Sequence, residues 1–433
     1  MAALLVASVA TAQTIEPAEE YAPTVYLIGV EESVVVDDAC DKLALMSDAT
    51  QDYLETHRHG FQQTERPMFV FATRDNRFSL ALGGFIALRA AYDFDGISDN
   101  LDFVPYNIPL TANYNNRQQL MMDASTSRLY FKGVANTNML GRVVIYVDAD
   151  FRGGSPKSYT PRVRSAYVSM LGFTLGRDVS TFCDLNAAPL TIDFQGPNAY
   201  NFNFATMIRY EYAFYDDHFK LGAAAEMPNV SATYNAKFLE MRQRIPDFPV
   251  YFQYAWDEDR SSHLRASAVF RNMYVRNAVV EENKSLFGWG VQLSGTIKAW
   301  DWLRFYMNGV YGKGITPYIS DLNGSGLDFM PDPDSPTSLT TPAMYGWQAA
   351  AQIHLFSDWL TLSGGYSTAV VRKSGGILSP NQYREGQYIF GNLFCHVTPR
   401  MTLAVEYLYG SRENMDGATN HANRASLMIK YTF

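Results

Sequence analysis

From Arg77 to the C-terminus, apolar and polar residues alternate with a period of two. In the run FNFATMIRYEYAF (202–214), Ile208, Tyr210 and Tyr212 share one face. Arg209 and Glu211 share the other face. The same alternation recurs in FGWGVQLSGTIKA (287–299) and YGWQAAAQIHL (345–355). A period of two is typical of β-strands with one apolar face. The runs extend over about ten residues, the length that a tilted strand needs to cross a bilayer.

Sixteen segments of this kind can be counted, and the connections between them alternate between short and long. The segments span residues 77–93, 124–136, 139–151, 161–171, 173–177, 200–215, 218–227, 249–257, 263–277, 284–299, 302–313, 342–355, 359–372, 385–397, 400–411 and 422–433. A transmembrane up-and-down barrel has tight periplasmic turns and longer outer loops, whereas a Greek-key sandwich does not alternate in this way. We therefore predict an all-β fold, an antiparallel transmembrane β-barrel of sixteen strands over residues 69–433, with both termini periplasmic.

The N-terminal part follows a different pattern. Residues 1–12 are apolar and end in Ala10-Thr11-Ala12, which is typical of a signal peptide with its cleavage site. Residues 13–68 are predicted to be a periplasmic segment. Apolar residues recur there at alternating steps of four and three and predict a helix over 37–59, either a coiled-coil seam or a single amphipathic helix. Residues Gly60 to Met68 are interpreted as a linker. No later apolar run approaches the ~18 residues of a spanning helix.

Composition narrows the function classes. Aromatic residues make up 14% of the 433 residues, which suits a barrel with aromatic girdles. The net charge of −9 argues against nucleic acid as a partner. The three cysteines form no metal-binding or disulfide pattern. The sequence contains no catalytic or phosphate-binding motif, so we expect no enzyme activity, no cofactor and no metal site.

The connection from Asp178 to Ala199 is unusually long for a segment without secondary structure, and such connections are usually functional. It contains three acidic residues, Asp178, Asp184 and Asp193, and an apolar set that includes Phe182, Leu190, Ile192 and Phe194. The apolar residues would gain by packing against an inner wall. We therefore predict a constriction loop folded into the barrel lumen. An ordinary surface loop is the alternative.

Several arginines fall on the inward parity of the predicted strands. A charged side chain at mid-depth on the lipid face costs about 2–4 kcal/mol, so these side chains are expected to face the lumen. Opposite the acidic loop they would create a transverse field at a pore. The predicted pore-lining residues are Asp178, Asp184, Asp193, Arg128, Arg162, Arg164, Arg209, Arg265 and Arg271. In the alternative reading, the arginines pair with Asp148, Asp150 or Glu211 as part of the wall.

The chain ends in RASLMIKYTF, an alternating strand whose terminal aromatic, Phe433, resembles the signal read by the outer-membrane assembly machinery. Together with FVFATRDNRFSLALGGFIALRAAYDF (69–94) and GRDVSTFCDLNAAPLTIDFQGPN (176–198), this strand resembles the DcaP-like trimeric outer-membrane porins of Gram-negative bacteria. The resemblance implies a homotrimer of sixteen-stranded barrels with a coiled-coil extension and a constricting third loop. It also implies contact with outer-membrane lipid and lipopolysaccharide.

Two functions remain open at this point. The first is passive diffusion of small hydrophilic solutes through a loop-constricted channel; the resemblance implies that anionic, dicarboxylate-like solutes are among them. The second is a non-conducting structural or surface-interaction barrel in the same membrane. For a trimer, we expect part of the barrel wall to be buried where small residues are frequent. These residues are Gly83, Gly84, Ala87, Ala90 and Ala91.

Overall fold

The computed structural model describes most of the chain from residue 59 onward. The described residues are 24–28 (backbone only), 51, 55–56, 59–65, 67–73, 77–97, 101–111, 114–155, 158–257, 260–335, 337–356, 359–376 and 381–433. The predicted signal peptide, 1–12, and nearly all of the predicted helix, 37–59, lie outside these residues.

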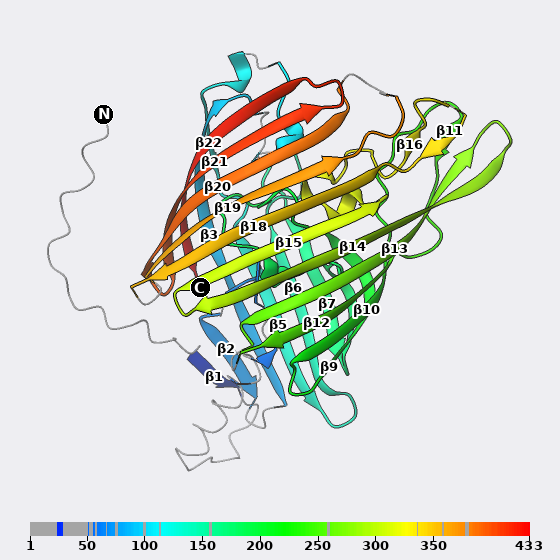
Figure 1. Cartoon of the computed structure of the whole chain (residues 1–433). Helices are drawn as coiled ribbons and strands as arrows, with labels where there is room; N and C mark the ends of the chain where they lie inside the picture. The colour runs from blue at the N-terminus through cyan, green and yellow to red at the C-terminus, as the bar shows by residue number, and fades with distance from the viewer. Residues whose placement is uncertain are drawn as a thin grey trace, which may run out of the picture.

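Sixteen strands form a closed antiparallel barrel, which confirms the predicted fold (Figure 1). The wall strands are β3 (Phe78–Asp95), β5 (Arg128–Thr137), β6 (Gly141–Asp150), β7 (Arg162–Met170), β8 (Phe173–Val179), β9 (Phe204–Phe214), β10 (Phe219–Glu226), β12 (Phe248–Trp256), β13 (Ser262–Asn277), β14 (Glu282–Trp300), β15 (Leu303–Lys313), β18 (Ala343–Leu355), β19 (Leu360–Val371), β20 (Tyr383–Thr398), β21 (Met401–Asn414) and β22 (Thr419–Thr432). Each overlaps one of the predicted segments. β22 pairs with β3 and closes the barrel.

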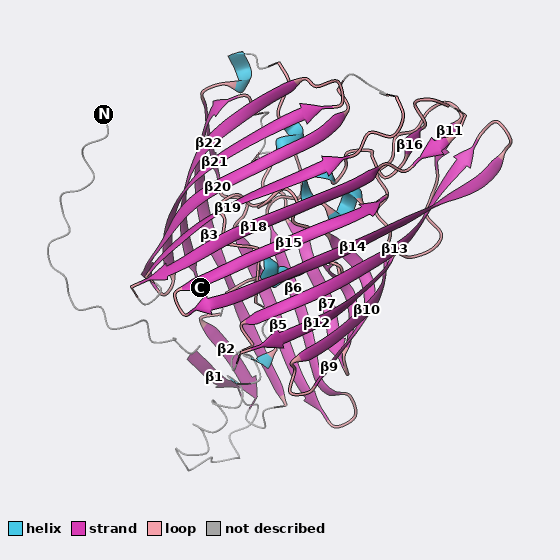
Figure 2. Cartoon of the chain, viewed as in Figure 1, coloured by secondary structure: helices cyan, strands magenta, loops and turns pink. Residues whose placement is uncertain are grey.

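Tight turns join the strands at one end, and long loops join them at the other (Figure 2). The turn between β7 and β8 consists of Leu171 and Gly172, and their backbone angles explain how so short a turn can form. Leu171 and Gly172 have φ values of 50° and 82°. Two consecutive positive φ values match the twist of the flanking strands, and glycine adopts such values without strain. We call the two ends of the barrel the short-turn end and the long-loop end.

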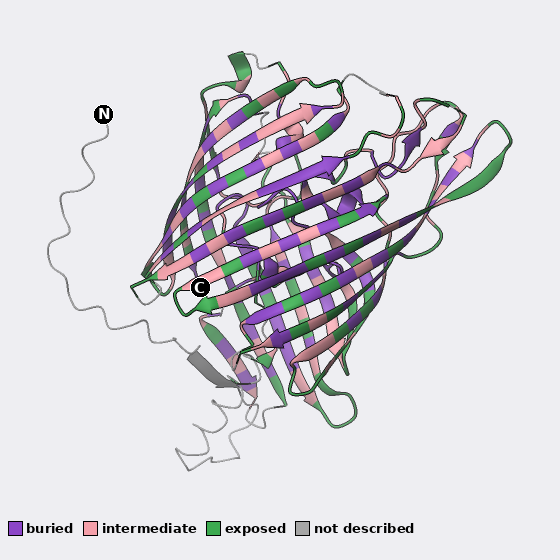
Figure 3. Ribbon diagram, in the orientation of Figure 1, coloured by how far each residue is buried: buried purple, intermediate pink, exposed green. Residues whose placement is uncertain are grey.

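Along most of the wall, exposed and buried residues alternate on each strand (Figure 3). Ile208 and Tyr210 of β9 are exposed on the outer surface, whereas Arg209 between them is buried inside. The alternation corrects part of the expected trimer contact: Gly83, Ala87 and Ala91 have the inward parity of β3, and only Gly84 and Ala90 face outward.

Among the described residues, six further strands lie outside the sixteen-stranded wall. They are β1 (Thr24–Ile28), β2 (Phe69–Thr73), β4 (Gln119–Asp123), β11 (Phe238–Glu240), β16 (Met330–Pro331) and β17 (Leu339–Thr340). β2 pairs with β3 directly beyond the point where the backbone of Phe433 bonds to Gly84. The N-terminal part is therefore attached to the barrel at the seam where the wall closes.

From residue 59 onward, the described helical structure consists of short 3₁₀ turns. They are η1 (Pro105–Asn107), η2 (Tyr114–Asn116), η3 (Leu185–Ala187), η4 (Thr316–Tyr318) and η5 (Ser320–Leu322). Within the described part of the chain, no helix has the length and apolar character needed to span a bilayer.

Candidate pore constriction

After β8 ends at Val179, the chain turns into the barrel and crosses it before β9 begins. We call residues 180–203 the lumen loop. Its bonds reach the inner faces of five wall strands on the far side. The wall partners are His263 of β13, Ser294 of β14, Gln348 of β18, Asn392 of β20 and Glu406 of β21. The structure thus places the loop predicted over 178–199 inside the barrel.

Asp184 fixes the first half of the lumen loop. One of its carboxylate oxygens lies 2.8 Å from His263 Nε2 and accepts a bond from Ser294 Oγ at 2.7 Å. Its other oxygen accepts from the backbone N–H of Asn186 at the start of η3. Burial alone would raise the pKa of Asp184, but His263 and Arg265 lower it to about 2. Asp184 is therefore a charged anchor of the loop, buried away from open solvent.

Asp193 fixes the second half. It accepts bonds from the backbone N–H of Phe103 at 3.0 Å and from the Tyr388 hydroxyl at 3.1 Å. The backbone N–H groups of Ile192 and Asp193 donate to Glu406 at 2.9 and 2.8 Å. Burial and the nearby Asp102 carboxylate raise the pKa of Asp193 to about 6. This anchor, unlike Asp184, titrates near neutral pH.

The apolar residues of the lumen loop are mostly buried, as their sequence predicted. Phe182 packs against Tyr318 and Ile315 in a cluster with the β15–β18 connection. Ile192 packs against Phe394 and inner-wall neighbours. Burial of a Phe or Ile side chain contributes roughly 1.5–3 kcal/mol, which offsets part of the cost of ordering the loop.

Leu190 is exposed, and Phe194 is only half buried. Phe194 lines cavities on both sides of the loop. Three guanidinium groups surround its ring. The distances from ring centroid to guanidinium carbon are 4.4 Å for Arg152, 5.1 Å for Arg164 and 6.0 Å for Arg89. Cations within about 6 Å of an aromatic face are attracted to it. Phe194 therefore stands at the junction of the two cavities, within a basic ring.

Residues 59–65 also lie inside the barrel, where the sequence predicted a linker. The backbone N–H of Phe61 donates to Leu185 O at 2.7 Å, and the Gln62 amide donates to Phe194 O at 3.3 Å. The Phe61 ring packs against Tyr200 and Phe202. These partners lie more than 120 residues away in sequence, so no local pattern identified them.

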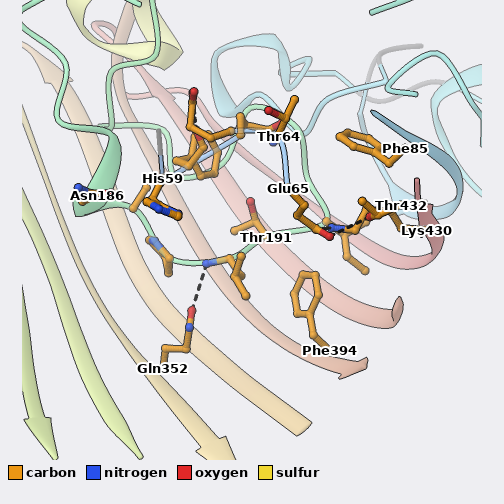
Figure 4. Close-up of a pocket in the computed structure, with 18 of the residues that line it drawn as sticks. His59, Thr64, Glu65, Phe85, Asn186, Thr191, Gln352, Phe394, Lys430 and Thr432 are labelled. Atoms are coloured by element: carbon orange, nitrogen blue, oxygen red, sulfur yellow. Dashed lines mark hydrogen bonds and ion pairs between the residues drawn. The ribbon is translucent and has the colours of Figure 1, made fainter. Parts of the chain in front are cut away.

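The two cavities lie at opposite ends of the lumen loop. The short-turn cavity has a volume of about 950 Å³, and the long-loop cavity about 470 Å³. In the short-turn cavity, Glu65 faces Lys430 and Thr432, and Gln352 reaches the loop from the opposite wall (Figure 4).

The predicted arginines pair with carboxylates of the wall, as in the alternative interpretation. Arg164 lies 3.6 Å from Asp148 and 3.2 Å from Asp150, and Arg162 lies 2.5 Å from Asp150. Arg128 lies 3.7 Å from Asp148.

Farther round the barrel, three more predicted arginines are engaged. Arg209 pairs with Asp178 at 2.8 Å and with Glu211 at 3.2 Å. Arg265 donates to the backbone oxygen of Thr181 at 2.6 Å. Arg271 pairs with Asp247 and Asp328. Of the nine residues predicted to line a pore, only Arg162 and Arg164 line either of the two cavities. Asp178, Asp184 and Asp193 are buried anchors.

Other cations, absent from that set, line the cavities. The long-loop cavity has Arg152 and Arg177, and the short-turn cavity has Arg260, Arg304 and Arg400. Arg304 has the inward parity of its strand, so the sequence alternation predicted that its side chain faces the lumen. Arg152, Arg260 and Arg400 lie in connections, where strand parity gives no direction.

Comparison with known proteins agrees with the geometry. A family model described as "DcaP outer membrane protein" matches residues 48–313, more than half of the chain. No curated protein is similar enough in sequence to match.

Solved structures share the fold. The crystal structure of the outer membrane channel DcaP of Acinetobacter baumannii has a TM-score of 0.72 at 20% identity, covering 82% of this chain and 97% of that one. OmpF of Salmonella typhi, in complex with daunomycin, has a TM-score of 0.52 at 13% identity, with coverages of 83% and 99%. The trimer form of OmpT of Vibrio cholerae, folded in vitro, has a TM-score of 0.50 at 12% identity, with coverages of 82% and 99%.

Proposed function

Because the chain belongs to the DcaP outer membrane protein family, and is thus a barrel of the Gram-negative outer membrane, we propose that it is a porin for passive diffusion of small hydrophilic solutes with a preference for anions. The observation that carries the preference is the excess of arginine over carboxylate at both cavities. The solute class that fits is a small dicarboxylate.

At the long-loop cavity, guanidinium groups are exposed to the cavity, whereas the carboxylates that neutralise their charge are buried in the wall. The side chain of Arg162 is 40% exposed, whereas its partner Asp150 is fully buried. Arg177 has the outward parity of β8 but borders the same cavity at its rim, and it forms no ion pair within the described residues. Asp102, paired with Arg152 at 2.6 Å, is the one carboxylate among the described residues that line it. A solute entering from this end meets mainly positive charge, and such charge biases which ions enter.

The short-turn cavity has the same bias. Arg260, Arg304 and Arg400 line it, and among the residues whose placement is described none of them forms an ion pair with a carboxylate. Among the described residues that line this cavity, Glu65 is the one carboxylate. Its side chain is 45% exposed, and Lys430 holds its pKa below the ordinary value.

The net charge of −9 does not oppose an anion preference, because several acidic side chains lie at the barrel ends, away from the lumen. Asp216, Asp217, Glu281, Glu282 and Asp301 are exposed in turns or at strand ends. Charges separated from the lumen by more than about 8–10 Å of salt solution act weakly on a permeating ion.

We assign the constriction to the lumen loop, with Phe194 as the narrow point between the cavities. The buried anchors at Asp184 and Asp193 hold the loop across the lumen from both halves. Both anchors precede Phe194, and Asn198 holds the loop after it by donating to Gly386 O at 2.8 Å. A loop held on both sides of Phe194 gives a defined pore size.

We also propose a homotrimer, since β8 is too short to span a bilayer alone. Its seven residues rise about 23 Å, or roughly 16 Å when tilted by 45°, against an apolar band of about 25 Å. A neighbouring copy would cover this low part of the wall. The trimer form recorded for OmpT of Vibrio cholerae has the same barrel fold. Native mass measured in mild detergent tests this; a monomer would contradict it.

The proposed function is tested by flux into liposomes containing the purified protein. A C4 dicarboxylate should enter faster than a neutral polyol of similar size, and a diamine of equal length should enter slowest. Combining Arg162→Gln with Arg177→Gln should reduce the dicarboxylate advantage. Arg276→Gln is the matched control, because Arg276 has the outward parity of β13 and lines neither cavity.

Faster entry of the diamine would contradict the anion preference. A folded barrel that passes none of the three solutes would contradict the porin function and support the non-conducting alternative.

A further inference from the structure

Residues 59–65 form a strap inside the barrel that touches both the wall and the lumen loop. We call this segment the lumen strap. It enters beside η3, where the Phe61 N–H bonds to Leu185 O, and continues toward β2, which pairs with β3. Four of its seven residues have a hydrogen bond or ring contact with a residue of the loop or the wall. They are Phe61, Gln62, Thr64 and Glu65, and Gly60 lies so close to Leu185 that a Cβ at this position would clash.

Phe61 is the apolar anchor of the strap. Its side chain is 6% exposed and packs in a cluster with Val179, Cys183, Ala188 and Tyr200 of the loop region. The Tyr200 and Phe202 rings meet it edge-on, with centroid distances of 5.2 and 5.4 Å. Edge-to-face pairs add stabilisation beyond the burial of area.

Gln62 links wall, strap and loop at one level of the lumen. Its backbone oxygen accepts from Arg128 of β5, and its side-chain amide donates to Phe194 O at 3.3 Å. Phe194 is the residue that lines both cavities. The strap therefore contacts the loop at the proposed narrow point of the pore.

The end of the strap is held by polar bonds to three strands. Thr64 Oγ1 lies 3.1 Å from the Tyr146 hydroxyl, and Tyr130 donates to Glu65 O at 3.0 Å. The Glu65 carboxylate pairs with Lys430 and accepts from Thr432 at 2.8 Å. A segment with this many fixed contacts is ordered in the lumen, since each bond offsets part of the entropy lost.

From this geometry we propose that the lumen strap is a second pore-forming element, which sets conductance together with Phe194 and tempers the anion preference through Glu65. The proposal rests on the proposed porin function and extends it. The selectivity of the channel then depends on a segment N-terminal to the barrel, and whatever displaces that segment widens the short-turn half of the pore.

The test uses single-channel recording of the full chain in planar bilayers. Gln63 lines the short-turn cavity, and its side chain makes one bond, to Phe61 O within the strap. In Gln63→Cys, a negatively charged methanethiosulfonate reagent should reduce the current, because it adds bulk and charge inside the pore. The control is the unmodified protein with the same reagent, in which Cys183 is buried and Cys395 is half buried.

Two further variants separate packing from charge. Phe61→Ala should raise conductance and current noise, whereas Phe69→Ala, at an exposed position of β2, should leave both unchanged. Glu65→Gln should shift the reversal potential in a salt gradient toward anions, because the cavity loses its lining carboxylate.

The outcomes distinguish this inference from the function on which it rests. If the unmodified protein carries no current, the porin function fails. If it conducts and the reagent leaves Gln63→Cys unaffected while mass spectrometry shows the label attached, the strap lies outside the pore and the inference fails.

Discussion

Two groups of arginines in this barrel have different roles. Arg271 represents one group and Arg162 the other, although both have the inward parity of their strands. Arg271 is fully buried between Asp247 and Asp328, at 2.9 and 3.1 Å, and also donates to Gly314 O and Asn229 O. Arg162 has one buried carboxylate partner and an exposed side that lines the long-loop cavity. The first holds two loops against β13, and the second presents charge to the pore.

The comparison shows that inward parity alone does not identify a pore residue. The role of a lumen arginine depends on its partners. An arginine enclosed by carboxylates and backbone oxygens stabilises the fold, whereas an arginine whose carboxylate partner lies on the side away from the cavity presents its charge to the pore. Four ways to test or sharpen this distinction follow.

Replacing Arg271 should have the largest effect on stability. Arg271→Ala leaves Asp247 and Asp328 as uncompensated buried charges, which costs about 3–5 kcal/mol. Arg162→Ala should cost about 1 kcal/mol or less, because that side chain is partly exposed. Chemical unfolding in detergent, followed by tryptophan fluorescence, measures both. Equal losses would contradict the division into two groups.

Asp184 belongs to the enclosed group and should behave as an anchor. Asp184→Asn weakens the charged bonds to His263 and Ser294 and should cost about 1.5–3 kcal/mol. We expect noisier single-channel currents as the lumen loop loosens, with little change in ion preference. A clean change of selectivity at constant noise would place Asp184 on the open pore surface instead.

Arg162 and Arg177 belong to the open group and should act on selectivity. Replacing both with Gln should lower the anion-to-cation permeability ratio roughly two- to tenfold, equivalent to about 0.4–1.4 kcal/mol. The reversal potential in a salt gradient gives this ratio, with Arg276→Gln as the control at an outward position. An unchanged ratio would mean that this cavity does not lie on the permeation path.

The smallest effect we predict is a pH dependence from Asp193. Its pKa is raised to about 6, so its carboxyl group gains a proton as pH falls from 7 to 5, and anion preference should rise slightly. Because the pKa of Asp193 is higher in the folded protein than in the unfolded chain, protonation of Asp193 stabilises the fold. This stabilisation is lost as pH rises through 6.

Asp193→Asn should reduce this change in the reversal potential, because it removes the Asp193 carboxyl group and its repulsion of the neighbouring Glu406 carboxylate. Burial also raises the pKa of Asp321 to about 6. Asp321 is present in both the unmodified protein and the Asp193→Asn variant, so its contribution cancels when their pH profiles are compared. Asp184, with its pKa lowered to about 2, keeps its charge throughout this range. Identical pH profiles for the two proteins would refute the assignment to Asp193.

The strands were predictable from sequence because their signal is local. Alternation over about ten residues and turn residues such as Gly172 define each hairpin without long-range information. The placement of the lumen loop followed from its apolar residues, Phe182 and Ile192, which need a wall to pack on.

The site could be predicted only in part, because ion pairing inside a barrel depends on distant partners. Arg271 and Asp328 are separated by 57 positions in the sequence, and no sequence pattern pairs them. Arg260 and Arg400 lie in turns, where parity is undefined. The strap was interpreted as a linker because Phe61 finds its apolar partners only after the loop has folded into the barrel.

The most direct test of the central claim is the reversal potential of the unmodified protein in a planar bilayer under a KCl gradient. If the guanidinium groups at both cavities set the preference, the protein should give stepwise currents with a reversal potential of the sign that marks chloride as the more permeant ion. A reversal potential of the opposite sign, marking potassium as more permeant, would contradict the account.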